Sequence, residues 1–376
     1  MRRTLVLVAA TCAGLVLSAP AAHASGQPAT SKTCGDCHKD IYRMWKASAH
    51  ANAMESDIYQ DAYRATEESE GKRVSHVCLK CHAPLAEVNS DWALEQKVTW
   101  EGVNCDACHS IAAVDTSGPN PRQVLAVGDV KRGPIRDAAS TAHEVAYSEL
   151  HATSLVCASC HEFTNAEGTP LMTTYSEWKE SGAAKSGKHC QTCHMGRTRA
   201  DVVDPKLVRI SNAEVNLHEV PGGHSIDQLN RALSVAVDHA RTADSLTVKV
   251  RLANRGAGHA VPTGMPGRRV ILALEVRSSD GQSFEEKRVY GKFFADAAGQ
   301  TITRDSRYFT SGVRLDSDTR IRPDERRTES FRFPIPARAT AFVTLKLHYE
   351  HAPTGDSAGR TWLTFFTQNR TLTPGS

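Results

Sequence analysis

The alternation of apolar and polar residues is clearest in the last third of the chain. Residues 246–252, LTVKVRL, alternate with a period of two, as a half-buried strand does. Residues 270–276, 341–349 and 362–366 are also strand-like, and turn residues such as Asp280 and Gly281 separate the runs. This part contains no cysteine. We expect it to form an antiparallel β-sandwich of about seven strands.

Before residue 245 the apolar positions follow helical spacing, in short stretches separated by loops. Residues 37–54 are predicted to be helical because apolar and aromatic positions recur there about every 3.6 residues. Residues 175–181 predict a short helix, and residues 226–240 predict a longer one with an apolar face. Residues 111–141 are rich in Gly and Pro, which predicts a loop with a short hairpin.

These patterns predict an α+β multidomain fold. Residues 25–225 are expected to form a mostly helical and loop domain, residues 226–244 a helical linker, and residues 245–376 the β-sandwich. The division rests on the change of period near residue 245, where helical spacing gives way to alternation.

Residues 1–24 have the pattern of a secretory signal peptide. Two arginines begin it, residues 4–17 are apolar, and the sequence AHA at residues 22–24 fits a cleavage site. The apolar run is short for a membrane span, so a retained anchor is the less favoured alternative. No later stretch is long and apolar enough for a transmembrane helix. The mature chain is therefore expected in the periplasm, or at the cell surface, without a membrane span.

Five copies of the sequence C-x-x-C-H lie between residues 34 and 194. They use ten of the eleven cysteines, and the remaining one, Cys12, lies in the predicted leader. Their members are Cys34, Cys37 and His38; Cys78, Cys81 and His82; Cys105, Cys108 and His109; Cys157, Cys160 and His161; and Cys190, Cys193 and His194.

The C-x-x-C-H sequence is the signature of covalent c-type haem attachment. The two thiols bind the porphyrin through thioethers, and the adjacent His binds the iron. Zinc sites and disulfides are the alternatives, but neither requires a His after every second cysteine. A His follows a given Cys by chance about once in twenty times, so five occurrences are not accidental. We expect five c-type haems, without which residues 25–225 would be largely unfolded.

Five further histidines are predicted to supply sixth ligands to the irons. They are His50, His143, His151, His224 and His259. His50 follows His38 by twelve residues, which is about 18 Å along a helix with a rotation of about 120°. It is therefore expected to serve a neighbouring haem, not the haem that His38 binds.

The other four candidates depend on their local sequence. His143 and His151 are spaced to share one helix face before the fourth motif. His224 follows a Gly pair that allows a close approach to a planar group, and His218 is its competitor. His259 lies in a loop bounded by Gly and Pro and could reach from the β-sandwich to a haem, which would clamp the two domains together.

Four histidines are interpreted differently. His76 and His189 stand so close to their own motifs that they are disfavoured as ligands. His348 and His351 flank Tyr349 and are expected at an exposed strand end, with a metal site as the less favoured alternative. No catalytic side chain is assigned.

The net charge gives no support for a nucleic acid or an anionic membrane as a partner. The whole chain carries a formal net charge of +3, and removing the two leader arginines leaves 3 − 2 = +1. Each ferric haem with two ionised propionates adds about −1, so the holoprotein would carry roughly −4. The basic sequence pI of 8.3 therefore does not indicate nucleic acid or an anionic membrane as a partner.

Several motifs resemble those of one known family. The first motif with Tyr42, Trp45 and the pair His50-Ala51 is similar to the opening of the multihaem cytochrome c family, which includes the tetrahaem cytochrome of the ammonia-oxidising chain. The sequences around Cys105 and Cys190 fit the same family. Residues 221–224 (PGGH) and 258–264 (GHAVPTG) resemble cytochrome c552- and c554-like relatives that carry a β-domain after the haems.

The resemblance implies electron transfer in the periplasm or at the cell surface, with mostly bis-His haems. The chain departs from pentahaem nitrite reductases, because it has no C-x-x-C-K motif. It also offers no sequence basis for the tyrosine crosslink of hydroxylamine-oxidising relatives.

Three functions are compatible with the sequence. The favoured one is an electron carrier that exchanges electrons with redox partner proteins. The alternative is an oxidoreductase in which one open haem acts on a small nitrogen or sulfur compound or on peroxide. The third is a structural subunit of a haem-containing homo- or hetero-assembly, in which the β-sandwich forms the joint.

Overall fold

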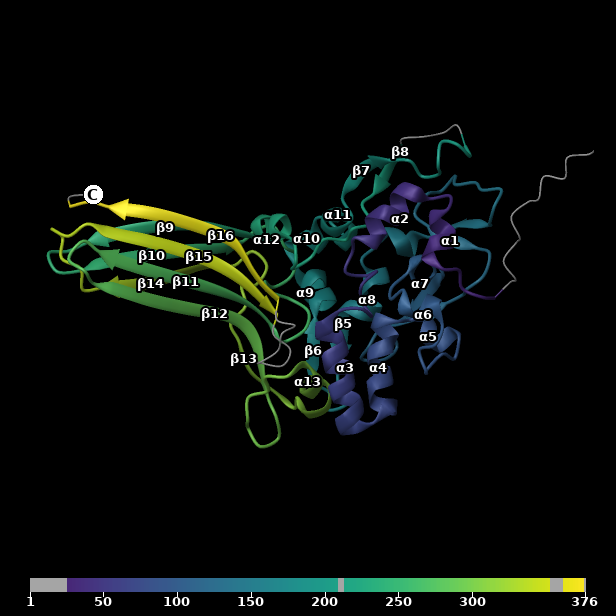
Figure 1. Cartoon of the computed structure of the whole chain (residues 1–376), viewed down its shortest axis with the longest axis horizontal. Coiled ribbons are helices and arrows are strands. Elements are labelled where there is room, and N and C mark those ends of the chain that lie inside the picture. Colours follow the sequence, from purple (N-terminus) through teal and green to yellow (C-terminus); the bar gives the residue numbers. More distant parts are fainter. Residues whose placement is uncertain (1–25, 209–212, 352–360, 375–376) are drawn as a thin grey trace, which may run out of the picture.

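The computed structural model describes residues 26–208, 213–351 and 361–374. The predicted signal peptide, residues 1–24, lies outside the described residues. Figure 1 shows a β-sandwich on one side, with the C-terminus at its far end, and a region of short helices on the other. The expected α+β fold is therefore confirmed: an N-terminal helical region is followed by antiparallel sheets.

The N-terminal region consists of short helices, and every C-x-x-C-H motif lies in or against one of them. The helices are α1 (Ser31–Gly35), α2 (Lys39–Lys46), α3 (Asp57–Glu70), α4 (Lys72–His82), α5 (Leu85–Val88), α6 (Lys97–Trp100), α7 (Cys105–His109), α8 (Leu155–His161), α9 (Thr174–Glu180), α10 (Gly182–Lys185) and α11 (Cys190–His194), with the 3₁₀ turn η1 (Glu149–Ala152). The short helix predicted at residues 175–181 is confirmed as α9.

Four two-stranded pairs connect these helices. They are β1 (Ile111–Asp115) with β2 (Arg122–Leu125), β3 (Lys131–Gly133) with β4 (Val145–Tyr147), β5 (Glu162–Thr164) with β6 (Pro170–Thr173), and β7 (Arg197–Ala200) with β8 (Ala213–Asn216). The pair β1–β2 confirms the hairpin predicted within residues 111–141. All pairs are antiparallel except β3–β4.

Two helix predictions in this region are wrong. The helix expected over residues 37–54 ends at Lys46. The hydroxyl of Ser48 accepts a hydrogen bond from the Ala51 N–H (3.1 Å), and the Asn52 amide donates to the Ser48 carbonyl (2.8 Å). These local bonds replace the helical ladder and turn the chain before His50.

The helical face expected to carry His143 and His151 does not form either. His143 precedes the short strand β4, and His151 lies in the 3₁₀ turn η1. Because β4 pairs with β3 through residues 145–147, the two histidines do not share a helix.

The helix predicted for residues 226–240, and with it the helical linker at 226–244, is wrong beyond Ala232. Helix α12 spans Ile226–Ala232, and the chain then continues as strand β9 (Leu233–Arg241). Strand β9 pairs over its full length with β10 (Leu246–Asn254). Leu233 and Val237 are buried with the sandwich core, so packing against β10 overrides the helical spacing of this segment.

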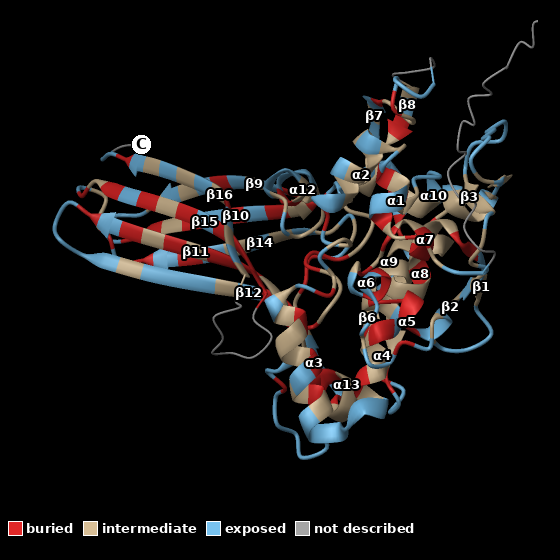
Figure 2. Cartoon of the chain, turned by 45° about the vertical axis from the view of Figure 1, so that its right-hand side comes forward, coloured by how far each residue is buried: buried red, intermediate tan, exposed pale blue. Residues whose placement is uncertain are grey.

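The sandwich consists of a three-stranded sheet in the order β14–β10–β9 and a five-stranded sheet in the order β13–β12–β11–β15–β16. Buried and exposed residues alternate along the strands, as Figure 2 shows. The buried faces of both sheets form one hydrophobic core. The remaining elements are β11 (Arg268–Ser278), β12 (Ser283–Ala295), α13 (Asp305–Ser311), β13 (Arg314–Asp318), β14 (Arg326–Phe333), β15 (Ala341–His351) and β16 (Thr361–Leu372).

The sandwich meets the helical region along several segments. Helix α13 packs beside α3, and Lys292 of β12 donates hydrogen bonds to carbonyls of β6. Among the described helices, none is long and apolar enough to cross a membrane.

Candidate haem-binding site

One cavity of about 2970 Å³ runs through the N-terminal region. An ordinary ligand pocket has a volume of roughly 300–1,000 Å³, so this cavity has room for several large cofactors. All ten motif cysteines and all five motif histidines line it, and every one of these thiols is free. Across the described ranges, no group of three or more His, Cys, Asp or Glu side chains converges as a zinc site requires. The residues therefore fit c-type haems and do not fit zinc.

Thiols from different motifs lie beside one another in this cavity. The thiols of Cys34 and Cys105, of Cys81 and Cys160, and of Cys157 and Cys190 lie close enough to shift the pKa values of one another. The first motif thus neighbours the third, and the fourth neighbours both the second and the fifth. The second and third motifs share no such contact. Burial within the cavity raises the pKa of Cys108 to about 12.

Three motif histidines face a second imidazole at nearly the same spacing. The ring centres are 6.2 Å apart for His38 and His143, 6.3 Å for His161 and His50, and 6.1 Å for His194 and His259. Rings in direct face-to-face contact would be closer. Metal-to-imidazole bonds of about 2 Å on either side of one iron place the ring centres roughly 6 Å apart.

The third motif has two candidate partners. His109 lies 5.9 Å from His151 and 6.5 Å from His218, measured between ring centres. The Nε2 of His151 lies 2.9 Å from the carbonyl oxygen of Cys108, so this nitrogen carries the proton and donates. His218 places its Nδ1 2.7 Å from the carbonyl oxygen of Asn216, which leaves Nε2 available for a metal. The geometry favours His218, which the sequence ranked only as a competitor of His224.

Backbone carbonyls orient most of these imidazoles. Nδ1 lies 2.5 Å from the Val202 oxygen in His38, 2.6 Å from the Arg132 oxygen in His109, and 2.7 Å from the Pro221 oxygen in His194. His82, His143 and His259 make equivalent contacts with the carbonyls of Ala53, Glu144 and Ala260. Metal-binding histidines usually donate their second N–H in this way, which fixes the tautomer and the ring orientation.

His82 of the second motif differs from the other four. Among the described residues, no second imidazole lies opposite it at the spacing of the other pairs. The Tyr59 ring stacks on His82 instead, with 3.9 Å between ring centres and 12° between the planes. Burial lowers the pKa of His82 to about 4, so the ring is neutral, as an iron ligand must be.

His224, predicted as a ligand, is not placed opposite a motif histidine. Its ring lies 6.1 Å from the Tyr349 ring in an edge-on arrangement. The two strand-end histidines are also not exposed as expected. His351 is buried and bonds Asp305 through Nε2 (2.8 Å), and His348 is buried with its Nδ1 2.8 Å from the Thr364 hydroxyl. The sandwich packs them against neighbouring elements that the sequence pattern did not place there.

Two disfavoured histidines and two tryptophans lie away from these pairs. His76 stacks on Trp92, with 4.9 Å between ring centres. Nδ1 of His189 accepts a hydrogen bond from the Ser154 N–H (3.2 Å). Trp92 and Trp100 are both about two-fifths exposed, at 37% and 38%, and do not line the cavity.

Comparison with known proteins agrees with this site. Residues 33–110 match the family model described as cytochrome c554 and c-prime. Cytochrome c-554 of Nitrosomonas europaea is 26% identical over 170 residues, which cover 42% of this chain and 69% of that protein. The crystal structure of a penta-heme cytochrome c552 from Thermochromatium tepidum covers 93% of this chain and all of that chain, with a TM-score of 0.74 and 22% identity.

These findings define the class of protein as a multihaem c-type cytochrome, which implies electron transfer. Over residues 33–110 the chain is similar to the cytochrome c554 and c-prime family. The likeness to the Thermochromatium structure shows that the fold, with its β-sandwich after the helical region, is also shared.

Proposed function

We propose that this chain binds five covalent c-type haems and transfers electrons through them. The observation that carries the proposal is that five complete C-x-x-C-H motifs line a single cavity. The haem supplies one-electron redox chemistry at iron. The protein fixes the distances between the haems, the axial ligands of each iron and the burial of each haem. The penta-heme cytochrome with the same fold supports the count of five.

Sixth ligands are proposed for four of the five irons. His143 would pair with His38, His218 with His109, His50 with His161, and His259 with His194. The spacing of the imidazoles, from 6.1 to 6.5 Å, supports each pair. This assignment replaces His151 by His218 and leaves His224 without an iron.

The order of the motifs in space supports a continuous path for electrons. The first motif touches the third through Cys34 and Cys105, and the fourth touches the fifth through Cys157 and Cys190. Cys108 of the third motif is close enough to raise the pKa of Cys157, after the larger effects of the Cys190 hydrogen bond and of burial. We therefore infer the order first, third, fourth and fifth, with the second motif branching from the fourth.

We infer the location of the protein and the class of its partners from the sequence. The signal pattern of residues 1–24 supports a location in the periplasm or at the cell surface, where covalent haem attachment takes place in bacteria. The partners would be redox proteins, within a homo- or hetero-assembly or in transient complexes. We also propose a haem domain from residue 25 to about residue 225 and a β-domain that begins at β9, at Leu233.

The test is a reductive titration of the purified, exported protein in the absence of oxygen. Full reduction followed at the visible absorption bands should consume about five electrons per chain and be reversible. Uptake of clearly fewer electrons, or a spectrum without c-type haem bands, would reject the proposal.

A second function is supported by His82. Because no second imidazole faces it among the described residues, an iron held there would keep one open position. An open haem can bind a small nitrogen or sulfur compound or peroxide. The protein would then be an oxidoreductase in which the other haems deliver or remove electrons.

A further inference from the structure

The loop that carries His259 crosses from the β-domain to the haem domain. Residues 257–264 follow β10 and bring the His259 ring to 6.1 Å from His194. We propose that Glu177 of α9 is a positioning residue, which holds this loop so that His259 stays opposite His194. The inference rests on the proposed ligand role of His259.

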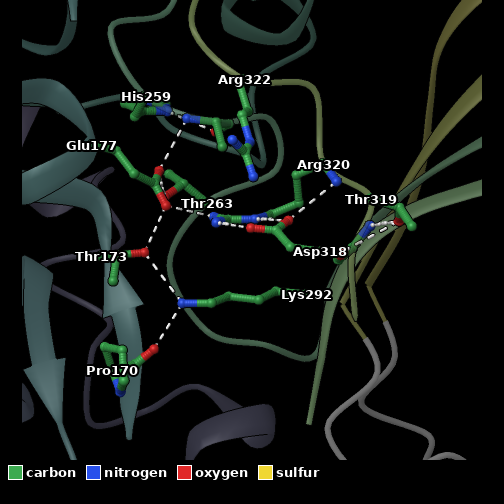
Figure 3. A network of polar contacts seen from close by, with 12 residues as sticks. Pro170, Thr173, Glu177, His259, Thr263, Lys292, Asp318, Thr319, Arg320 and Arg322 are labelled. Atoms are coloured by element: carbon green, nitrogen blue, oxygen red, sulfur yellow. Dashed lines mark hydrogen bonds and ion pairs between the residues drawn. The ribbon is translucent and has the colours of Figure 1, made fainter. Parts of the chain in front are cut away.

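One carboxylate oxygen of Glu177 binds the loop directly. Oε2 accepts a hydrogen bond from the Ala260 N–H (3.0 Å) and another from the Thr263 hydroxyl (3.1 Å), as Figure 3 shows. The first donor belongs to the peptide that joins His259 to Ala260. A shift of this carboxylate would therefore move the backbone of His259 itself.

The other oxygen anchors Glu177 in place. Oε1 accepts from the Thr173 hydroxyl (2.6 Å) and lies 2.8 Å from a guanidinium nitrogen of Arg320. The Glu177 and Arg320 side chains are 15% and 7% exposed, so water screens this pair little. Arg320 is held in turn by Asp318, whose pKa stays below its usual range because the guanidinium outweighs the effect of burial.

Gly258, in the same loop, is also packed closely against the haem domain. A Cβ added to Gly258 would lie 2.9 Å from the Ala183 Cβ and 3.1 Å from a ring carbon of Trp178. The Asn254 amide donates to the His259 carbonyl (2.8 Å). The loop is thus held in two ways. Side chains of α9 and α10 pack against Gly258, and Glu177 binds the loop through hydrogen bonds.

A carboxylate suits this position better than a neutral side chain. All four partners of Glu177 are donors, two on each oxygen, and an ionised carboxylate accepts on both oxygens. A glutamine would present its NH₂ group to one of these pairs and would lose the bond to Arg320 or to the Ala260 N–H, because only the Thr hydroxyl of each pair can also accept. The surrounding donors therefore favour an ionised side chain at position 177, which bridges the loop and the haem domain.

Lys292 provides a matched control, because it also joins the two domains. Its amine donates to the carbonyls of Pro170 (2.7 Å) and Leu171 (3.3 Å) in β6 and to the Thr173 hydroxyl (3.3 Å), and it makes no hydrogen bond to the His259 loop. Replacing Lys292 with methionine weakens the same interface but retains the Thr173 hydroxyl and both bonds from Glu177 to the loop. The comparison separates positioning of His259 from general cohesion of the domains.

The experiment compares Glu177→Ala, Glu177→Gln, Lys292→Met and His259→Ala as purified holoproteins. The measurements are the spin state of each haem by electron paramagnetic resonance and the haem potentials. Glu177→Ala should convert a large part of one haem in five to the high-spin form, and Glu177→Gln should shift one potential with a smaller spin change. Lys292→Met should leave the spin state and the potential of every haem unchanged.

Each remaining outcome is decisive. If Lys292→Met gives the same high-spin signal as Glu177→Ala, the effect is general loosening of the interface and the positioning role is wrong. If both Glu177 variants keep the original spectra and potentials while His259→Ala does not, the positioning role is wrong but the ligand role of His259 stands. If His259→Ala itself changes nothing, the ligand assignment fails, independently of the electron-transfer function.

Discussion

The imidazole rings of His194 and His259 lie 6.1 Å apart, although one belongs to a haem motif and the other to a loop of the β-sandwich. A metal bound by both would join the two domains through coordination bonds. The ion pair between Glu177 and Arg320 forms a second link between the two domains. In the proposed assignment, the β-sandwich therefore supplies a ligand to the haem of the fifth motif.

Replacing His259 with Ala should convert about one haem in five from low spin to high spin, because the sixth ligand of one iron is lost. One potential should shift as well, since the axial ligand is a primary determinant of haem potential. Electron paramagnetic resonance and a potentiometric titration measure both effects. An unchanged spectrum in a folded variant would mean that His259 only stabilises its loop by hydrogen bonding.

His218 and His151 make a matched pair of substitutions. His218→Ala should give one high-spin haem, because the free Nε2 of this residue is the proposed ligand opposite His109. His151→Ala should leave all spin states unchanged and lower stability by about 1 kcal/mol, since it removes hydrogen bonds to Ser148 and Cys108. The reverse result would show that His151 rotates to bind the iron.

The haem attached through His82 should bind an external ligand. Titration of the oxidised protein with cyanide should give a spectral change with about one equivalent per chain, because four irons are already capped by imidazoles. The His259→Ala variant should bind about two equivalents. A protein in which all five haems are low spin and cyanide causes no change would contradict the open position, and with it the oxidoreductase alternative.

The stability of the protein should depend on Lys292 at alkaline pH. Burial, aided by the charge of Arg320, lowers the pKa of this amine to about 8 from its ordinary 10.5. Between these values the unfolded chain holds a proton that the folded chain has released, so stability rises with pH. Relative to Lys292→Met, the free energy of unfolding should increase by up to about 1.4 kcal/mol per pH unit across this window. A constant difference from pH 7 to 10 would show that the amine keeps its proton.

The sequence predicted the haem-binding motifs and the strands better than the extents of the helices. The five motifs and the strands of the sandwich could be recognised because their signals are local: a fixed spacing, or a period of two. The expectation that His50 serves a haem other than that of His38 stays a prediction, although the helix used in that argument ends at Lys46. Its pairing with His161 depends on turns around Ser48 that no periodicity reveals.

Long-range contacts account for the errors. Leu233 and Val237 fit a helical face and an alternating strand equally well, and pairing with β10 selected the strand. The choice between His151 and His218 depends on which ring nitrogen is already hydrogen-bonded, which only the fold determines. Glu177 had no sequence signal, because the loop residues that it holds lie more than eighty residues away in the β-domain.

The number of covalent haems tests the central claim most directly. Protein recovered from the exported fraction would be denatured, extracted with acid-acetone to remove non-covalent haem, and assayed as the pyridine haemochrome. Five complete motifs predict a ratio close to five haems per chain. A ratio near zero, with zinc bound to the cysteines, would contradict the account.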